Sequence, residues 1–432
     1  MTFRNAVTLS RRFIAGAIVS FLTLAALTGC VAPADTGTFT IWMTSSPASA
    51  EGTAWNSAVE AFRTAHPRLN VDVVQKDPHT LEAGGNSNLQ GAATPDVAEW
   101  QKGVATGSAS SSNLLTDLGA YSSKYGWEKL LPSSFLQVGQ YSSGKMGAGT
   151  LYGVPSNVGF VSFYYNADLL AAAGINPASL THISALTAAF DKFVQSGVTP
   201  LASADFLLTY VSYSLSLNGA DRAWINAYQF QDGAAVNFND ARFTTASETL
   251  KIWSDKKYFG SALTAASSSA TDAVSAFVSG KTPFLFAGSE LDNDITALAT
   301  FRWGKFLAPG NSFSVGSPGN LWVIPVAGTK KDLAAEFINL TLQPAAQNVL
   351  AQGGGGAIAA EPTAVTSPLA LKNLPLIATL LKTNAVAFYP DWPASGYEPV
   401  LVNAARDLVA GKITPAQYRS LIGDYYAQKV RK

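Results

Sequence analysis

Charged residues are scarce in this chain of 432 residues. Asp, Glu, Lys and Arg make up 13% of it, against about 25% in a typical globular protein, and 29 basic residues balance 29 acidic ones. A protein that binds nucleic acid needs a basic face to neutralise phosphates, so this composition argues against one. The chain is 47% hydrophobic and contains 9 Trp, 15 Tyr and 23 Phe, which excludes a disordered or coiled-coil protein.

Residues that usually build metal and redox sites are also few. Cys30 is the single cysteine, so an intramolecular disulfide or a paired-cysteine metal site is impossible. The three histidines, His66, His79 and His182, stand far apart and have no ligand spacing. We therefore expect no metal, no cofactor and no enzymatic activity. A pair of carboxylates for glycoside hydrolysis stays open as an alternative, because two such acids need not be close in sequence.

Long apolar runs are missing except near the N-terminus. Residues Phe13–Leu27 form an apolar run of 15 residues behind Arg4, Arg11 and Arg12. That run is shorter than the roughly 20 residues of a membrane-spanning helix, and the whole pattern is typical of a signal peptide. Removing this leader leaves 26 basic and 29 acidic residues, so the mature chain has a net charge near −3.

The leader ends at a candidate lipidation site. The sequence Leu27-Thr28-Gly29-Cys30 resembles the lipobox of bacterial lipoproteins. This resemblance implies that residues 1–29 are a lipoprotein signal peptide and that Cys30 receives a diacylglyceryl group with acyl chains such as palmitate. Residues 30–38 would then form a lipid-anchored tether. Two or three acyl chains suffice for stable anchoring, here on the outer face of the cytoplasmic membrane.

Strands and helices alternate in the body of the chain. Residues 39–43 predict a strand, a helix follows from Glu51 to Pro67, and residues 69–73 predict a second strand. Such a unit belongs to a parallel α/β sheet. Ligands collect at the carboxyl ends of parallel strands, so we expect the loop after the first strand, which contains Ser45, to be a wall of the site.

Glycine and proline mark the ends of further elements. A strand is expected at residues 160–165, followed by helices at 167–173 and 185–194. Thr414 begins a capping-box pattern at the start of a C-terminal helix. The run Gly353–Gly356 is interpreted as a flexible turn.

Several stretches follow one another in an order that suggests a family. They are residues 62–73, 94–97, 151–155, 163–175, 276–288 and 332–347. In this order they resemble the family 1 extracellular solute-binding proteins of ATP-driven importers, the group that includes the maltose-binding protein. The resemblance covers nearly the whole mature chain.

The resemblance implies an α/β, periplasmic-binding-protein-like fold, with two α/β lobes joined by three crossing segments and a ligand cleft between them. Closure would be a hinge motion. The expected crossings are residues 157–159, 284–286 and 315–321. The expected lobes are 39–157 with 287–318, and 158–286 with 319–432. The C-terminal helices could pack back on the first of these.

Nine residues at expected strand ends and crossings are candidates for binding a ligand: Ser45, Glu99, Trp100, Asn157, Ser289, Glu290, Asn320, Trp322 and Trp392. A sugar presents hydroxyl edges and an apolar face, so its site needs polar side chains and an aromatic plate. The resemblance implies that Trp100 stands at the position where the maltose-binding protein has a cleft tryptophan. Packing in or over the core is the alternative for Trp100 and Trp392, and a solvated surface acid is the alternative for Glu99.

The scarcity of charge bears on the ligand. Strongly charged solutes usually need clustered opposite charge, whereas a neutral sugar needs amides, hydroxyls and aromatic rings. We therefore expect the ligand to be a neutral sugar or oligosaccharide. The resemblance implies a monomeric carbohydrate receptor that delivers this ligand to the membrane permease of an ABC importer. The alternatives are an exported glycoside hydrolase or lyase, and a receptor for another solute such as glycerol phosphate.

Overall fold

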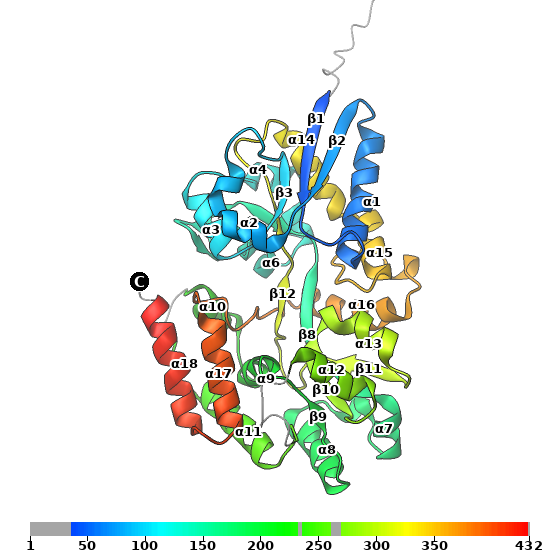
Figure 1. The fold of residues 1–432 in the computed structure, drawn as a ribbon, viewed down its shortest axis with the longest axis vertical. Helices are drawn as coiled ribbons and strands as arrows, with labels where there is room; N and C mark the ends of the chain where they lie inside the picture. Colours follow the sequence, from blue (N-terminus) through cyan, green and yellow to red (C-terminus); the bar gives the residue numbers. More distant parts are fainter. Residues whose placement is uncertain (1–35, 232–235, 261–268, 431–432) are drawn as a thin grey trace, which may run out of the picture.

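The computed structural model describes residues 36–231, 236–260 and 269–430 (Figure 1). The predicted signal peptide, the lipidation site Cys30 and most of the tether lie outside these residues. The last two tether residues, Gly37 and Thr38, already belong to the first strand. In the part of the chain that the structure describes, no helix combines the length and the apolar character needed to cross a bilayer.

The chain folds into two α/β lobes, one above the other in Figure 1. The sheet of the first lobe has the order β2-β1-β3-β13-β7. Its strands are β1 (Gly37–Met43), β2 (Leu69–Gln75), β3 (Val97–Trp100), β7 (Gly153–Pro155) and β13 (Leu321–Val323). The strand β1 runs parallel to β2 and β3, while β13 is antiparallel to β3 and β7. This sheet contains the strand–helix–strand unit expected from the sequence.

The first lobe also contains several helices and a small sheet. The helices are α1 (Ala50–Ala65), α2 (Pro78–Gly84), α3 (Val104–Ser111), α4 (Gly119–Tyr125), α5 (Trp127–Leu130), α6 (Ser133–Gln137), α14 (Lys331–Thr341) and α15 (Pro344–Gln352). The small sheet consists of β4 (Gln140–Ser142), β5 (Lys145–Met146) and β6 (Thr150–Leu151). The helix α1 packs on α14 and α15, and its Phe62 lies against Phe39 of β1 with ring centroids 4.9 Å apart. This packing fixes the start of α1 beside the end of β1.

The sheet of the second lobe has the order β11-β8-β10-β9, with β12 also paired to β8. Its strands are β8 (Val158–Asn166), β9 (Leu201–Ala202), β10 (Phe284–Gly288), β11 (Trp303–Phe306) and β12 (Gly316–Pro318). Its helices are α7 (Ala167–Ala172), α8 (Ile183–Gln195), α9 (Leu207–Ser216), α10 (Arg222–Phe230), α11 (Ala241–Asp255), α12 (Ala270–Val278), α13 (Asp292–Leu298), α16 (Pro368–Lys382), α17 (Tyr397–Val409) and α18 (Pro415–Val430). The strand expected at 160–165 and the helices expected at 167–173 and 185–194 are confirmed.

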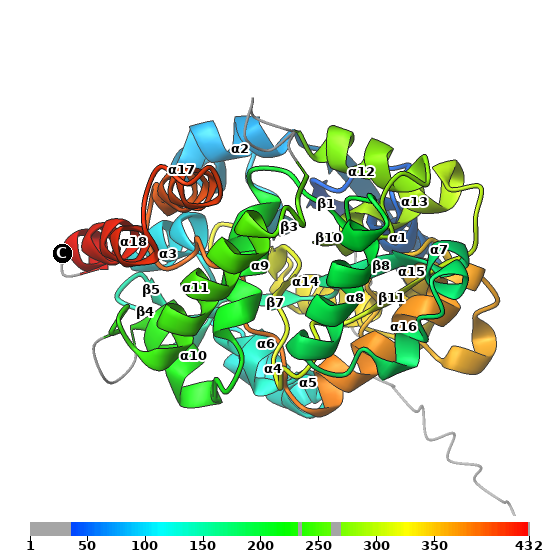
Figure 2. The same cartoon turned by 90° about the horizontal axis from the view of Figure 1, so that it is seen from below.

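The C-terminal helices pack on the second lobe. The helix α17 contacts α9, and α18 contacts α11; the pair lies side by side at one edge of the molecule (Figure 1, Figure 2). The capping box is confirmed, because Thr414 N donates to Gln417 Oε1 at 2.8 Å and Gln417 N donates to Thr414 Oγ1 at 3.2 Å. This second lobe therefore forms a broad helical body under the cleft.

Three segments cross between the lobes. Two lie where the sequence places them, at the start of β8 and between β12 and β13. The third is not at 284–286, because β10 is a fully buried strand paired with β8 and β9 inside the second lobe. It is the glycine run Gly353–Gly356, whose end pairs with the start of β8 through a hydrogen bond of 2.9 Å from Val158 N to Gly356 O. The expected turn is thus a crossing.

The lobe boundaries after residue 287 differ from the expected ones. The strands β11 and β12 fall within 287–318, which the sequence assigned to the first lobe, yet both pair with β8 of the second lobe. The strand β13 and the helices α14 and α15 fall after 319, yet β13 pairs with β3 and β7, and α1 packs on both helices. Both differences have one origin. A crossing expected at 284–286 assigns residues 287–318 to the first lobe and the residues after 319 to the second, whereas the chain stays in the second lobe until the crossing between β12 and β13.

Candidate functional site

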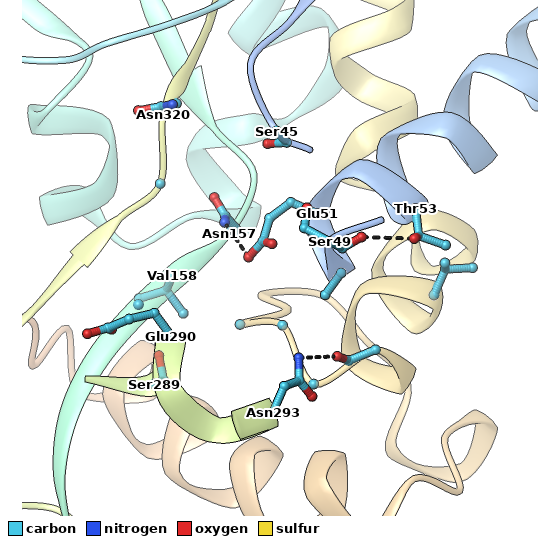
Figure 3. A pocket seen from close by; sticks show the side chains of 18 of the residues that line it. Ser45, Ser49, Glu51, Thr53, Asn157, Val158, Ser289, Glu290, Asn293 and Asn320 are labelled. Atoms are coloured by element: carbon cyan, nitrogen blue, oxygen red, sulfur yellow. Dashed lines mark hydrogen bonds between the residues drawn. The ribbon is translucent and has the colours of Figure 1, made fainter. Parts of the chain in front are cut away.

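A cavity of about 1030 Å³ lies between the two lobes (Figure 3). Its upper wall comes from the loop after β1, the start of α1 and the end of β3. Its lower wall comes from the short turn Ser289–Leu291 after β10, and the three crossing segments close its sides. The volume lies at the upper end of the roughly 300–1,000 Å³ of small-molecule sites.

Six of the nine predicted site residues line this cavity: Ser45, Glu99, Asn157, Ser289, Glu290 and Asn320. Each lies at the end of a strand, just after one or in a crossing segment, which is why reasoning from strand ends brings them together. Figure 3 shows Glu290 and Ser289 at the lower side of the same space, Ser45 and Asn320 at the upper side, and Asn157 between them. That these side chains contact a ligand stays a prediction.

Glu99 is used by its own chain. Its Oε2 accepts hydrogen bonds from Thr44 N at 2.7 Å and Ser45 N at 2.8 Å, and its Oε1 accepts one from Ser45 Oγ at 2.6 Å. The residue is only 5% exposed. Glu99 thus fixes the loop after β1, which forms the upper wall, and has little capacity left for a ligand.

Glu290 enters the same cavity from the second lobe and is exposed to it. Within the described part of the chain, no hydrogen bond joins its carboxylate to another residue. The carboxylate folds back over Gly288, where an added Cβ would lie 2.0 Å from Oε2. Loss of hydration between the cavity walls raises the pKa of Glu290, and the nearby Asp292 adds to the effect. Glu290 is available to accept hydrogen bonds from a ligand.

Two amides and a hydroxyl among the predicted residues add to the polar lining. Asn157 Nδ2 donates to Glu51 Oε1 at 3.4 Å, and Asn320 Nδ2 donates to Thr44 Oγ1 at 3.3 Å. Ser289 Oγ accepts from Phe160 N at 3.2 Å, so the hydroxyl hydrogen remains able to donate. These bonds hold the side chains in place, and each amide keeps further donor and acceptor capacity.

Tyr389 supplies an aromatic ring to the cavity, and sequence reasoning missed it. Its ring stacks on Tyr210 with centroids 5.3 Å apart and an interplanar angle of 26°. Gly159 lies beside it, since a Cβ there would be 3.5 Å from the Tyr389 hydroxyl, an ordinary van der Waals distance. Tyr389 belongs to the same aromatic, proline-rich loop as Trp392. The composition of this loop therefore indicated that it lies at the site, but it did not show which aromatic ring faces the cavity.

Two predicted tryptophans lie beside the main cavity instead. Trp100 and Trp392 line a neighbouring cavity of about 510 Å³. Trp100 is 3% exposed, and its Nε1 has no hydrogen-bond partner among the described residues. Trp392 is half-buried and packs on Phe388 with ring centroids 5.4 Å apart. Lys102 lines both cavities.

Trp322 is a correction to the predicted site, because it lines neither of these cavities. It is 1% exposed and packs edge-on against Trp55 and Phe337, at 6.1 and 5.2 Å between ring centroids. Its Nε1 donates to Ser156 Oγ at 3.0 Å. The strand β13 has three residues and all are buried, so no alternation of polar and apolar residues shows which face the tryptophan takes.

Metal chemistry has no visible basis in the described ranges. Among residues 36–231, 236–260 and 269–430, no three His, Cys, Asp or Glu side chains gather into a group that could hold a metal ion.

Two α/β lobes, three crossings and a polar cavity between the lobes define a two-lobed receptor for a small solute. A family model for bacterial extracellular solute-binding proteins matches residues 57–379. The chain belongs to this family, whose members act outside the cytoplasm, so the protein is exported. No curated protein is similar enough in sequence to count as a relative.

Solved structures share the fold at low sequence identity. The bacterial solute receptor AcbH, described as preferring β-D-galactopyranose, has a TM-score of 0.70 at 18% identity and covers 91% of this chain and 98% of its own. A chitin oligosaccharide binding protein has a TM-score of 0.69 at 18% identity, covering 92% and 100%. The GacH receptor of Streptomyces glaucescens, solved with acarbose, has a TM-score of 0.66 at 18% identity, covering 92% and 99%.

Proposed function

We propose that this protein is the carbohydrate receptor of an ABC importer and binds a neutral sugar or oligosaccharide between its lobes. The observation that carries the proposal is the interlobe cavity, where amides, hydroxyls and a free carboxylate face a tyrosine ring. Sugar hydroxyls match the first groups and the apolar sugar face matches the ring. The similar structures described with a galactopyranose, a chitin oligosaccharide and acarbose support a saccharide for this chain as well.

The charge of the cavity favours a neutral ligand over an anion. Glu51, Glu99 and Glu290 line it, while Lys102 is the one basic residue of its described lining. A phosphate group would meet a net negative wall, which disfavours it through like-charge repulsion. Glycerol phosphate is therefore the weaker alternative.

We further propose binding without catalysis. Glycoside hydrolysis needs two carboxyl groups that can exchange protons or attack the sugar. Glu99 is tied to the backbone of the loop after β1, and Glu51 accepts a hydrogen bond from Asn157. Glu290 is therefore the acid of the cavity lining that bonds to no other described residue. Release of reducing sugar from oligosaccharides, abolished by Glu290→Gln, would instead favour the hydrolase alternative.

The same proposal includes a monomer held at the outer face of the cytoplasmic membrane by lipid on Cys30. The support is the sequence Leu27–Cys30 together with membership of an extracellular family. Closure of the lobes around a sugar would present one shape to the permease, because a ligand that touches both lobes binds the closed state better. We expect Cys30→Ser to block lipid processing, which cell fractionation would detect. Normal processing and membrane retention of the variant would contradict a lipid anchor at Cys30.

A thermal-shift panel tests the ligand class. Purified protein is mixed with mono- and oligosaccharides, with glycerol 3-phosphate and with charged amino acids as controls. A solute at 100 times its Kd stabilises the folded state by about 2.7 kcal/mol, which raises the melting temperature by several degrees. We expect a rise with one class of saccharide and none with glycerol 3-phosphate. A rise with glycerol 3-phosphate alone would contradict a neutral ligand.

A further inference from the structure

Lys102 stands between the two cavities of the cleft. It follows β3 by two residues and lines both the cavity of about 1030 Å³ and that of about 510 Å³. Its Nζ donates to Gly319 O at 3.4 Å and lies 5.0 Å from the centroid of the Trp392 ring. One side chain thus joins the first lobe, a crossing segment and a loop of the second lobe.

The walls on either side of Lys102 differ in chemistry although they come from the same segments. From the loop after β1, the end of β3 and the loop before α17, one residue each faces the larger cavity: Ser45, Glu99 and Tyr389. A near neighbour of each faces the smaller cavity: Thr44, Trp100 and Trp392. The two cavities are therefore adjoining parts of one cleft, one rich in polar groups and one carrying two indoles.

We infer that Lys102 divides the cleft into these two compartments and so limits the length of the saccharide that it binds, an inference that rests on the proposed function. The face of an indole attracts either a cation or the apolar face of a sugar, and it holds one occupant at a time. With Lys102 in place, the ammonium lies over Trp392. A saccharide seated beside Glu290 can extend onto Trp392 only when Lys102 leaves.

The surroundings of Lys102 are those of a side chain that lies in the wall between the two compartments. Burial lowers the pKa of Lys102 to about 8, against the opposing attraction of Asp391. Few other contacts hold the ammonium. Among the described residues it donates one long hydrogen bond, to Gly319 O. Such a side chain can be removed without opening a core.

Isothermal titration of Lys102→Ala tests the inference. The probes are malto-, xylo- and chito-oligosaccharides of one to five rings. For the series that binds, we expect the ratio of the affinity for the longest member to that for the shortest to rise at least tenfold in the variant. Replacing Trp392 with Leu in the Lys102→Ala background should return the ratio to the wild-type value, because the longer saccharide then loses its aromatic contact.

Lys76→Ala is the matched control. Lys76 Nζ also lies over an indole, 4.0 Å from the ring centroid of Trp42, but this residue lines neither cavity. In Lys76→Ala, the ratio of the affinity for the longest saccharide to that for the shortest should equal the wild-type ratio. Lys102→Ser, which also removes the stem and the ammonium, carries the same test should the alanine variant fold poorly.

An unchanged or lowered ratio in the Lys102 variants, with saccharides still binding to the wild type, would overturn this inference and leave the proposed function standing. Binding of none of the three series to any of the proteins would overturn both. The two failures are therefore distinguishable in one set of titrations.

Discussion

Two glutamates face the same cavity from opposite lobes, and they differ in what their carboxylates bind. Glu99 accepts three hydrogen bonds from residues 44 and 45. Glu290 bonds to no other residue in the described part of the chain and lies over Gly288. The first carboxylate therefore builds the wall, and the second is free for a solute. Position at a strand end brings an acid to the cleft, but the neighbouring backbone decides whether that acid remains available.

Removing the Glu99 carboxylate should have the largest effect. In Glu99→Ala, two backbone N–H groups and the Ser45 hydroxyl lose their acceptor. Leaving buried donors unpaired costs about 1–3 kcal/mol each, reduced where water reaches the loop, so we expect the free energy of unfolding in urea to fall by about 2–4 kcal/mol. A loss below about 0.5 kcal/mol would show that the loop does not depend on Glu99.

Glu290→Gln should do the reverse, weakening binding while sparing the fold. Hydrogen bonds to a charged group contribute about 1.5–3 kcal/mol, so the affinity for the saccharide that binds should fall at least tenfold in calorimetric titration. The free energy of unfolding should not decrease, because no other described residue bonds to this carboxylate. Unchanged affinity together with a large loss of stability would make Glu290 a structural residue like Glu99.

Gly288→Ala should displace the Glu290 carboxylate without replacing it. The added Cβ would lie 2.0 Å from Oε2, and the end of a flexible side chain can move away. We expect a loss of affinity of about threefold, smaller than in Glu290→Gln. The double variant should bind like Glu290→Gln alone; additive losses would show that Gly288 acts by another route.

The raised pKa of Glu290 predicts the smallest effect, a pH-dependent change in stability. The folded protein holds the Glu290 proton more tightly than the unfolded chain, in which the pKa of this carboxyl group is near 4.5. Stability from this proton is present below pH 4.5 and is lost as pH rises through the folded pKa. The difference in the free energy of unfolding between Glu290→Gln and the wild type should therefore shift in favour of the variant from pH 4 to pH 7. We expect this shift to be less than about 1 kcal/mol. Urea unfolding at both pH values measures this, and a difference that does not depend on pH would contradict it.

Much of the fold follows from local pattern. Alternation in residues 69–73 and helical spacing after Glu51 predicted β2 and α1, because one side of each of these elements is buried and the other is not. Alternation in residues 39–43 predicted β1, although this strand lies between β2 and β3 and buries Trp42 as well as Ile41 and Met43. The polar side of the site followed as well. Ligand cavities in such folds lie at strand ends, and polar residues at strand ends are visible in a sequence.

The rest depends on packing that the sequence does not display. The strand β10 is buried on both faces, so its apolar run resembles a crossing as much as a central strand. Trp322 and Tyr389 show the same limit for aromatic side chains, since the first faces the core and the second faces the cavity. The glycines 353–356 form a crossing because Gly356 approaches β8 closely: a Cβ there would lie 1.6 Å from Val158 O.

A crystal structure of the protein grown with the saccharide that most raises its melting temperature tests the central claim most directly. The account predicts one saccharide between the lobes, with a sugar hydroxyl bonded to Glu290 and a sugar ring against Tyr389. Density for the saccharide on an outer surface, with the interlobe cavity filled by solvent, would contradict it.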